Sequence, residues 1–370
     1  MGIKAGLIGL PNVGKSTLFN ALTKSSIPAE NYPFCTIEPH LAITTVPDRR
    51  LDQLTKIYNS TKKIPATVSF VDIAGLVKGA AKGEGLGNQF LNHIREVDLM
   101  LHVLRCFQDP NIIHEGEKID PESDYETIIA ELMLKDLESI EKRLEKLEKL
   151  KRSVAGKPAE LKELTDETSL LEKIKKAIDK GDIEQIRMLV LQSSIKTIPL
   201  LASKNFLIIA NISEDEIDGK KYKNNQHYKA LTKRFGEDKV VAISAKIEYE
   251  LSQLSEQDAQ EFMKEIGLKE KSLDTIIRET YKHLGLITFF TCGPKESHAW
   301  PIKRGTTVRS AGGEIHTDLE RGFICAEVFN CEDLFEHGNT AILKELGKIR
   351  TEGQDYIVKD GDIIQIRFNV

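Results

Sequence analysis

The stretch Gly9–Ser16, which reads GLPNVGKS, decides the fold of this chain of 370 residues. Its spacing is G-x-x-x-x-G-K-S, and it stands between an apolar run at residues 3–8 and a helix-like run at residues 17–22. Glycines let a backbone approach phosphate groups, and the N–H groups of such a loop and of the following helix start hold negative charge. This strand–loop–helix setting predicts a phosphate-binding loop. In that loop, we expect Lys15 to reach the β- and γ-phosphates and the Ser16 hydroxyl to ligate Mg²⁺.

A second motif follows the next apolar strand. Residues 67–72 read as a buried strand, and Asp72 then opens the sequence D-I-A-G. In nucleotide switches this element places a carboxylate near Mg²⁺ and a glycine N–H near the γ-phosphate. We therefore expect Asp72 to act as a metal ligand and Gly75 to contact the γ-phosphate. Thr36, in the irregular stretch between the two motifs, is the expected third metal ligand.

Two later strands, at residues 206–211 and 240–244, carry the candidate base-reading residues. Asn211-Ile212-Ser213-Glu214 stands where a guanine-specific protein has N-K-x-D, and Ser244-Ala245-Lys246 matches the loop on the other side of the base. The longer Glu214 cannot keep the paired hydrogen bonds to guanine, a loss of roughly 10⁴-fold. Ile212 also removes the lysine stem that packs on the base. Since an amide reads the N6/N7 edge of adenine, Asn211 is expected to favour ATP over GTP.

The residue after D-I-A-G is Leu76, where many switch GTPases place the glutamine that orients the attacking water. Hydrolysis is therefore expected to be slow, to need a partner, or to use another segment. His114 is the candidate for that task, because an unperturbed imidazole can position water or accept its proton near neutral pH. Phe107 fits a core or base-stacking position better than a catalytic one.

Bulk properties narrow the class of protein. The net charge is −5, with 40% hydrophobic and 29% charged residues, so no global basicity points to nucleic acid or to a membrane surface. No apolar run is long enough to cross a membrane. The five cysteines are scattered and never have C-x-x-C spacing, which is typical of a reducing cytoplasm and gives no sign of a zinc site.

The pattern of elements predicts an α/β fold with one insertion and one appended domain. Residues 1–124 and 200–284 are expected to form the P-loop domain, and residues 125–199 an inserted helical coiled-coil hairpin. The hairpin is indicated by apolar residues spaced alternately by three and four, at Met133, Leu137, Ile140, Leu144 and Leu147. Residues 285–370 read as a small β-rich α+β domain of short strands and turns, with Gly312-Gly313 among the turns.

These motifs together resemble the YchF/Obg-like ATPase family, and the likeness extends along the whole chain. The stretch NYPFCTIEP at residues 31–39, the run DIAGLVKGA at 72–80, Asn211 with Glu214, and the terminal DGD at 360–362 carry it. The resemblance implies a P-loop ATPase with a C-terminal TGS-like (β-grasp) domain that associates with ribosomes. It implies nucleotide binding through Asn12, Val13, Gly14, Lys15, Ser16, Thr17 and Ile212, and Mg²⁺ binding through Ser16 and Thr36. It also leaves K⁺ open as a second cation, because Asn12 resembles the asparagine of potassium-stimulated relatives.

The expected function is thus a cytoplasmic, monomeric ATPase that acts as a nucleotide switch in translation or stress regulation, on the ribosome and its RNA, with the large subunit expected. Two alternatives stay open: a GTPase, and a nucleotide-gated adaptor for RNA or the ribosome in which hydrolysis is incidental. The basic cluster Lys149, Lys151, Arg152 and Lys157 at the hairpin tip is either a solvated end or an RNA-contacting arm.

Overall fold

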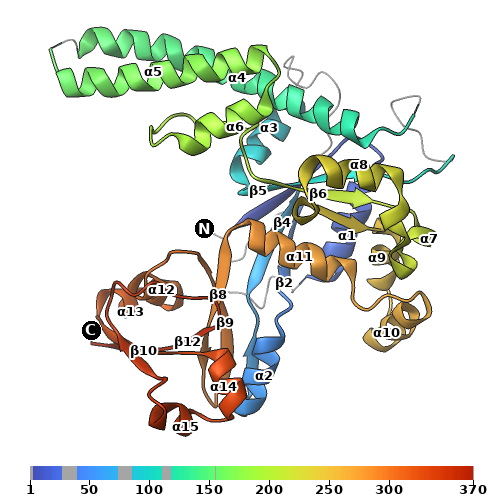
Figure 1. The fold of residues 1–370 in the computed structure, drawn as a ribbon, viewed down its shortest axis with the longest axis vertical. Helices are drawn as coiled ribbons and strands as arrows, with labels where there is room; N and C mark the ends of the chain where they lie inside the picture. The colour runs from blue at the N-terminus through green and yellow to red at the C-terminus, as the bar shows by residue number, and fades with distance from the viewer. Residues whose placement is uncertain (1–2, 27–39, 74–85, 111–117, 155, 370) are drawn as a thin grey trace.

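The computed structural model describes residues 3–26, 40–73, 86–110, 118–154 and 156–369. Its centre is a six-stranded sheet in the order β2-β4-β1-β5-β6-β7 (Figure 1). β2 runs antiparallel to β4, and all other neighbours are parallel. The strands are β1 Lys4–Ile8, β2 Leu41–Thr45, β4 Thr67–Asp72, β5 Leu99–Arg105, β6 Phe206–Asn211 and β7 Val240–Ile243. The predicted α/β fold is confirmed, as are the strands predicted at residues 67–72, 206–211 and 240–244.

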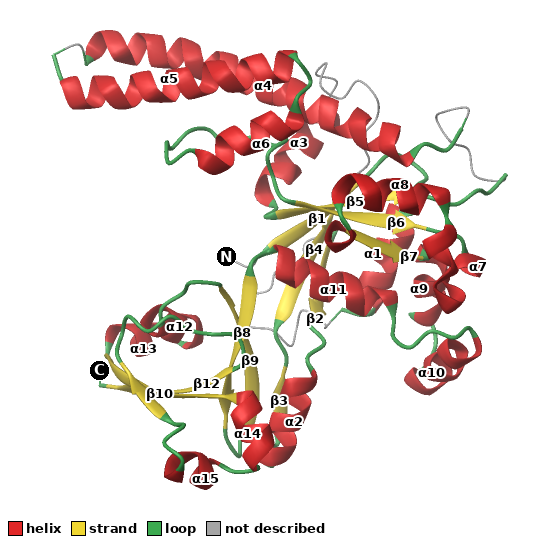
Figure 2. Ribbon diagram, in the orientation of Figure 1, coloured by secondary structure: helices red, strands yellow, loops and turns green. Residues whose placement is uncertain are grey.

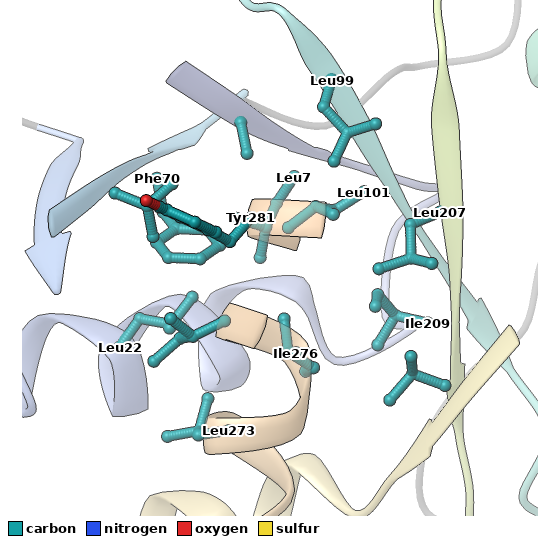
Figure 3. Packing of buried hydrophobic residues seen from close by; sticks show 14 of the residues in the cluster. Leu7, Leu22, Phe70, Leu99, Leu101, Leu207, Ile209, Leu273, Ile276 and Tyr281 are labelled. Atoms are coloured by element: carbon teal, nitrogen blue, oxygen red, sulfur yellow. The ribbon is translucent and has the colours of Figure 1, made fainter. Parts of the chain in front are cut away.

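Helices cover both faces of this sheet, which explains why β5 and β6 are buried at every residue. On one face, α1 (Lys15–Lys24) and α11 (Ser272–His283) pack on strand residues such as Leu101 and Ile209 (Figure 3). On the other face lie α3 (Leu86–Glu96), the start of α4 (Pro121–Ser153) and α8 (Gln226–Phe235). The shorter helices of this domain include α7 Glu214–Ile217, α9 Ala245–Leu251 and α10 Glu256–Glu265.

The inserted hairpin projects from the sheet domain as a long arm (Figure 1). It consists of α4, α5 (Pro158–Asp179) and α6 (Ile183–Gln192), which share a separate hydrophobic cluster around Ile140, Leu171 and Ile174. Its base is fixed by buried Asp136, whose carboxylate accepts the backbone N–H groups of Leu201 and Ala202 at 2.8 and 2.9 Å. The arm is therefore anchored where the chain returns to β6.

The C-terminal domain has a second six-stranded sheet, in the order β11-β10-β12-β8-β9-β3. Its own strands are β8 Leu286–Cys292, β9 Glu296–Lys303, β10 Phe323–Asn330, β11 Arg350–Glu352 and β12 Asp362–Phe368. Its helices are α12 Val308–Ile315, α13 Thr317–Arg321, α14 Cys331–His337 and α15 Thr340–Glu345. One face packs a core that includes Phe289, Val308 and Val328.

The structure corrects one sequence expectation in this region and adds a strand that the sequence did not suggest. Gly312 and Gly313, predicted as a turn, lie inside α12. A Cβ at residue 312 would approach Ile366 to 2.9 Å, so the glycine lets the helix lie close to the sheet. The sixth strand, β3 (Lys62–Ile64), comes from the N-terminal part of the chain and pairs in parallel with β9.

Within the described ranges, no helix is long and apolar enough to cross a membrane. The described cysteines Cys106, Cys292, Cys325 and Cys331 are free thiols.

Candidate functional site: a nucleotide cleft

The phosphate-binding loop leaves β1 and ends at Gly14, which caps α1 with a left-handed φ of 97°. A side chain at this position would place its Cβ 2.3 Å from Nδ2 of Asn211. Residue 14 therefore requires glycine for its backbone angle and for the close approach of Asn211.

Lys15 is the buried cation of this loop, with only 7% of the residue exposed. Its Nζ donates to the carbonyl oxygen of Leu10 at 2.7 Å. Burial lowers the pKa of the Lys15 ammonium to about 8, although the nearby Asp72 carboxylate raises it. Burial raises the pKa of the Asp72 carboxyl at the end of β4, whereas the nearby Lys15 and His40 lower it. A cation and a carboxylate thus interact at the carboxyl edge of the sheet.

Asn211, the last residue of β6, joins the two sides of the site. Only 4% of it is exposed; its Nδ2 donates to the carbonyl of Val13 at 2.9 Å, and its Oδ1 accepts the N–H of Ala245 at 3.0 Å. The sequence suggested that Asn211 reads the edge of adenine. Since both polar atoms of this amide are bonded to backbone, the geometry gives Asn211 the role of positioning the phosphate loop against the loop after β7, and its contact with adenine stays a prediction.

The opposite wall carries an ion pair. Lys246 Nζ lies 2.6 Å from Glu214 Oε1, with side chains 63% and 46% exposed. The hydrogen bond that Lys246 donates to the Glu214 carboxylate raises the pKa of Lys246. Ile212 is buried beneath this wall at 2% exposure. The carboxylate expected to meet the base is therefore engaged by a lysine of the neighbouring loop.

A third wall follows β5 and depends on Arg105, which the sequence analysis missed. This arginine is 1% exposed; its guanidinium donates to the carbonyls of Phe107 and Asp109, at 3.2 Å each, and lies 4.7 Å from the Phe107 ring centroid. The only signal in the sequence was a basic residue closing an otherwise apolar strand. Arg105 holds the wall of the cleft to which Phe107 belongs.

Together these walls enclose a cleft of about 490 Å³. It is lined by Asn12, Gly14, Lys15, Ser16, Thr17, Phe107, Gln108, Asp109, Asn211, Ile212, Ser213, Glu214, Ser244, Ala245 and Lys246. Of the residues expected to bind nucleotide, Val13 alone does not line it, because its side chain is buried and only its carbonyl takes part. Gln108, Asp109 and Ser213 were missed; they stand in loops at the carboxyl ends of strands, where ligands of such sheets bind.

Three expected residues, Thr36, Gly75 and His114, lie outside the described residues, as does Leu76. Of the expected metal ligands, Ser16 is the second residue of α1 and Asp72 ends β4. Both offer hard oxygen donors, which fit Mg²⁺. In the part of the chain that the structure describes, no group of three or more His, Cys, Asp or Glu side chains could hold a metal.

The mostly parallel sheet carries a phosphate loop after its first strand, a carboxylate beside the loop lysine, and the Lys246–Glu214 ion pair on the opposite wall of the cleft. These features define a P-loop nucleoside triphosphatase. The family model YchF-GTPase_C, described as a protein of unknown function (DUF933), matches residues 286–369, and the model of the 50S ribosome-binding GTPase matches residues 4–154. The chain is 45% identical to the ribosome-binding ATPase YchF of Bacillus subtilis, and each chain is covered completely. It belongs to the YchF/Obg-like ATPase family.

Further relatives agree with this placement. Obg-like ATPase 1 of rice is 42% identical, with 100% of this chain and 92% of the rice protein covered. The solved structure titled the Schizosaccharomyces pombe YchF GTPase superposes with a TM-score of 0.85 at 35% identity, covering 99% of this chain and 98% of that one. The names of these relatives differ in the nucleotide that they imply: the Bacillus subtilis and rice proteins are called ATPases, and the Schizosaccharomyces pombe structure is called a GTPase.

Proposed function

We propose that this chain is an Mg²⁺-dependent ATPase that prefers ATP over GTP, turns over slowly alone and is accelerated by the ribosome. The observation that carries this proposal is the single cleft with the phosphate loop on one wall and the Glu214–Lys246 pair on another. Its volume is within the range of small-molecule sites.

The described residues divide the work by position. Lys15 and the N–H groups at the start of α1 bind the phosphates, because a helix N-terminus and a buried ammonium both favour negative charge. Ser16 and Asp72, with Thr36, would hold Mg²⁺, which neutralises charge on the transferring phosphate when bound. Gly75 is proposed to contact the γ-phosphate and His114 to position the attacking water. Asn211 keeps the phosphate wall and the base wall at a fixed separation.

The preference for ATP is attributed to the ion pair. Guanine presents donors at N1 and N2, and a carboxylate must be free to accept both of them. In this cleft, Glu214 is longer than the usual aspartate and is held by Lys246. The N–H of Ala245 is likewise engaged by Asn211. A guanine base would therefore have to break existing contacts, whereas adenine does not present the same paired donors.

Ribosome binding is proposed from the printed names of the relatives and of the N-terminal family model. We expect contact with RNA of the large subunit, and the exposed residues Lys149, Arg152 and Lys157 at the end of the arm are candidates. Lys157 already pairs with Glu160 at 2.9 Å, so the tip is less positive than its lysines suggest. We also propose that the protein is a cytoplasmic monomer and that K⁺ binds near Asn12. The proposed domains are the P-loop domain of residues 1–124 and 200–284, the inserted hairpin of residues 125–199 and the C-terminal domain of residues 285–370.

The test is phosphate release from saturating Mg-ATP, with and without ribosomes. Wild-type protein is expected to turn over well below about 1 s⁻¹ alone and faster with ribosomes, whereas unassisted turnover of roughly 1–100 s⁻¹ would contradict the proposal. Lys15→Ala should abolish ATP binding, and His114→Ala should bind ATP but hydrolyse it more slowly. Lys63→Ala, outside the cleft, is the matched control. If His114→Ala lost hydrolysis but kept full ribosome-dependent function, the adaptor alternative would replace the ATPase switch.

A further inference from the structure

The neighbouring strands β2 and β4 of the nucleotide domain are joined by a segment that pairs with the C-terminal sheet. β2 and β4 pair in antiparallel register from Leu41–Val71 to Thr45–Thr67. At one end of this pair lies Asp72, whose carboxylate interacts with Lys15 of the phosphate loop. At the other end, the N–H of Val46 donates to the carbonyl of Ala66 at 2.8 Å. That bond joins the two ends of residues 46–66, which we call the docking segment. We call this closing pair, Val46 with Ala66, the neck of the segment.

The docking segment adds a strand to the C-terminal sheet (Figure 2). β3 pairs in parallel with β9, with Lys62 opposite Glu296 and Ile64 opposite His298. The approach to this strand is also bonded: the N–H of Thr61 donates to the carbonyl of Pro294 at 3.1 Å, and Ser60 Oγ donates to that of Gly293 at 2.7 Å. These bonds make the C-terminal sheet continuous with a part of the nucleotide domain.

A charged clamp fixes the other half of the segment. Arg50, at the start of α2 (Arg49–Ile57), donates to Asp48 within the segment at 2.8 Å and to Asp360 of the C-terminal domain at 2.7 Å. Asp360 also accepts the N–H of Thr288 in β8 at 2.9 Å. The Arg50 guanidinium lies 5.3 Å from the ring centroid of Phe290 in the same strand. One planar side chain therefore ties α2 to two elements of the C-terminal domain.

We propose that the docking segment couples nucleotide binding in the cleft to the C-terminal domain, and that Arg50 is the positioning residue of this coupling. The five-residue strand pair spans about 17 Å and is held by ladder hydrogen bonds along its length. A displacement at the Asp72 end is therefore carried to the neck rather than absorbed within the pair. Because the neck leads into the C-terminal sheet, the two sites share one continuous hydrogen-bonded path, and such coupling is reciprocal. This inference rests on the proposed nucleotide-dependent function.

The experiment is amide hydrogen exchange on the full chain, saturated in turn with ADP and with a non-hydrolysable ATP analogue, both with Mg²⁺. Wild-type protein should show a nucleotide-dependent difference in exchange within residues 46–66 and 286–303. Arg50→Ala should lose the difference in 286–303 while keeping it in the phosphate loop. Asp360→Asn tests the same clamp more gently, since its amide oxygen can still accept from Thr288. Lys63→Ala, which removes a pair with Asp52 inside the segment, should behave as wild type.

Reciprocity gives a second readout. In both clamp variants, the ratio of the dissociation constants for ADP and for the ATP analogue should change by about fivefold or more, the lower end of typical coupling. Nucleotide binding to wild type without any exchange difference in 286–303 would overturn the coupling but leave the ATPase intact. The same difference in wild type and in both clamp variants would overturn the role of Arg50. A wild-type protein that binds neither nucleotide would overturn the proposed function, and the coupling with it.

Discussion

Replacing Asn211 by alanine should damage both the stability and the affinity of the nucleotide cleft. The substitution removes the hydrogen bonds to the Val13 carbonyl and the Ala245 N–H, at a residue that is 4% exposed. Each buried backbone group left without a partner costs about 1–3 kcal/mol, so the two groups together predict a loss of roughly 2–6 kcal/mol in the free energy of unfolding. The free energy of unfolding is measured by urea titration without nucleotide.

The same substitution should weaken the binding of both ATP and ADP, because it frees the phosphate wall from the base wall. If about 1.4 kcal/mol of this free energy is lost from nucleotide binding, the affinity for nucleotide drops about tenfold. Isothermal titration calorimetry gives this value directly. Ser203→Ala, before β6 and outside the cleft lining, is the control, and it should change neither quantity appreciably, because Ser203 is only partly buried and its hydroxyl donates to the nearby Leu200 carbonyl. Unchanged stability and affinity in Asn211→Ala would refute the positioning role.

Three further predictions concern residues that the fold holds in unusual states. Since burial lowers the pKa of Lys15 to about 8 and bound phosphate favours the protonated ammonium, ATP affinity should fall by up to about tenfold per pH unit above pH 8, with proton uptake visible in calorimetry across buffers. A pH-independent affinity up to pH 9.5 would contradict this assignment. Gly14→Ala should lose ATP binding, because its left-handed φ costs about 1–2 kcal/mol and its Cβ would meet Asn211 at 2.3 Å; near-normal ATP affinity in titration would count against it. Burial raises the pKa of Asp136 to about 6, so the folded chain holds a proton that the unfolded chain has already released. The free energy of unfolding contributed by this group should therefore fall as the pH rises from about 4 to 6. Asp136→Asn should remove that part of the pH dependence of urea unfolding, and an identical profile in both proteins would argue against it.

Much of the cleft could be predicted from the sequence because its parts are local. The phosphate loop, the strand ending at Asp72 and the residues after β6 and β7 each depend on short patterns whose geometry follows from glycine freedom and from the edge of a parallel sheet. The expected residues after those strands do line one cleft, and the bridging role of Asn211 is what the structure adds.

The parts that escaped prediction depend on contacts between distant segments. β3 is a three-residue strand with two exposed lysines, so no alternation of apolar residues marks it; its backbone bonds to residues 294–298 create it. Arg105 looked like the polar end of a strand, yet it is buried because carbonyls of its own loop satisfy it. The Gly312-Gly313 pair suggested a turn, whereas the closeness of Ile366 to residue 312 explains why a glycine stands inside a helix there.

The most direct test of the central claim is a side-by-side titration of ATP and GTP with Mg²⁺ on wild type and on the double variant Ile212→Lys with Glu214→Asp. We predict that wild type binds ATP at least about tenfold more tightly than GTP, because Lys246 holds the Glu214 carboxylate. A tenfold difference in affinity corresponds to about 1.4 kcal/mol of binding free energy. The double variant, which restores the lysine stem and the shorter carboxylate, should shift toward GTP. Tighter binding of GTP by wild type would contradict the account, because it would mean that Glu214 leaves Lys246 and reads guanine.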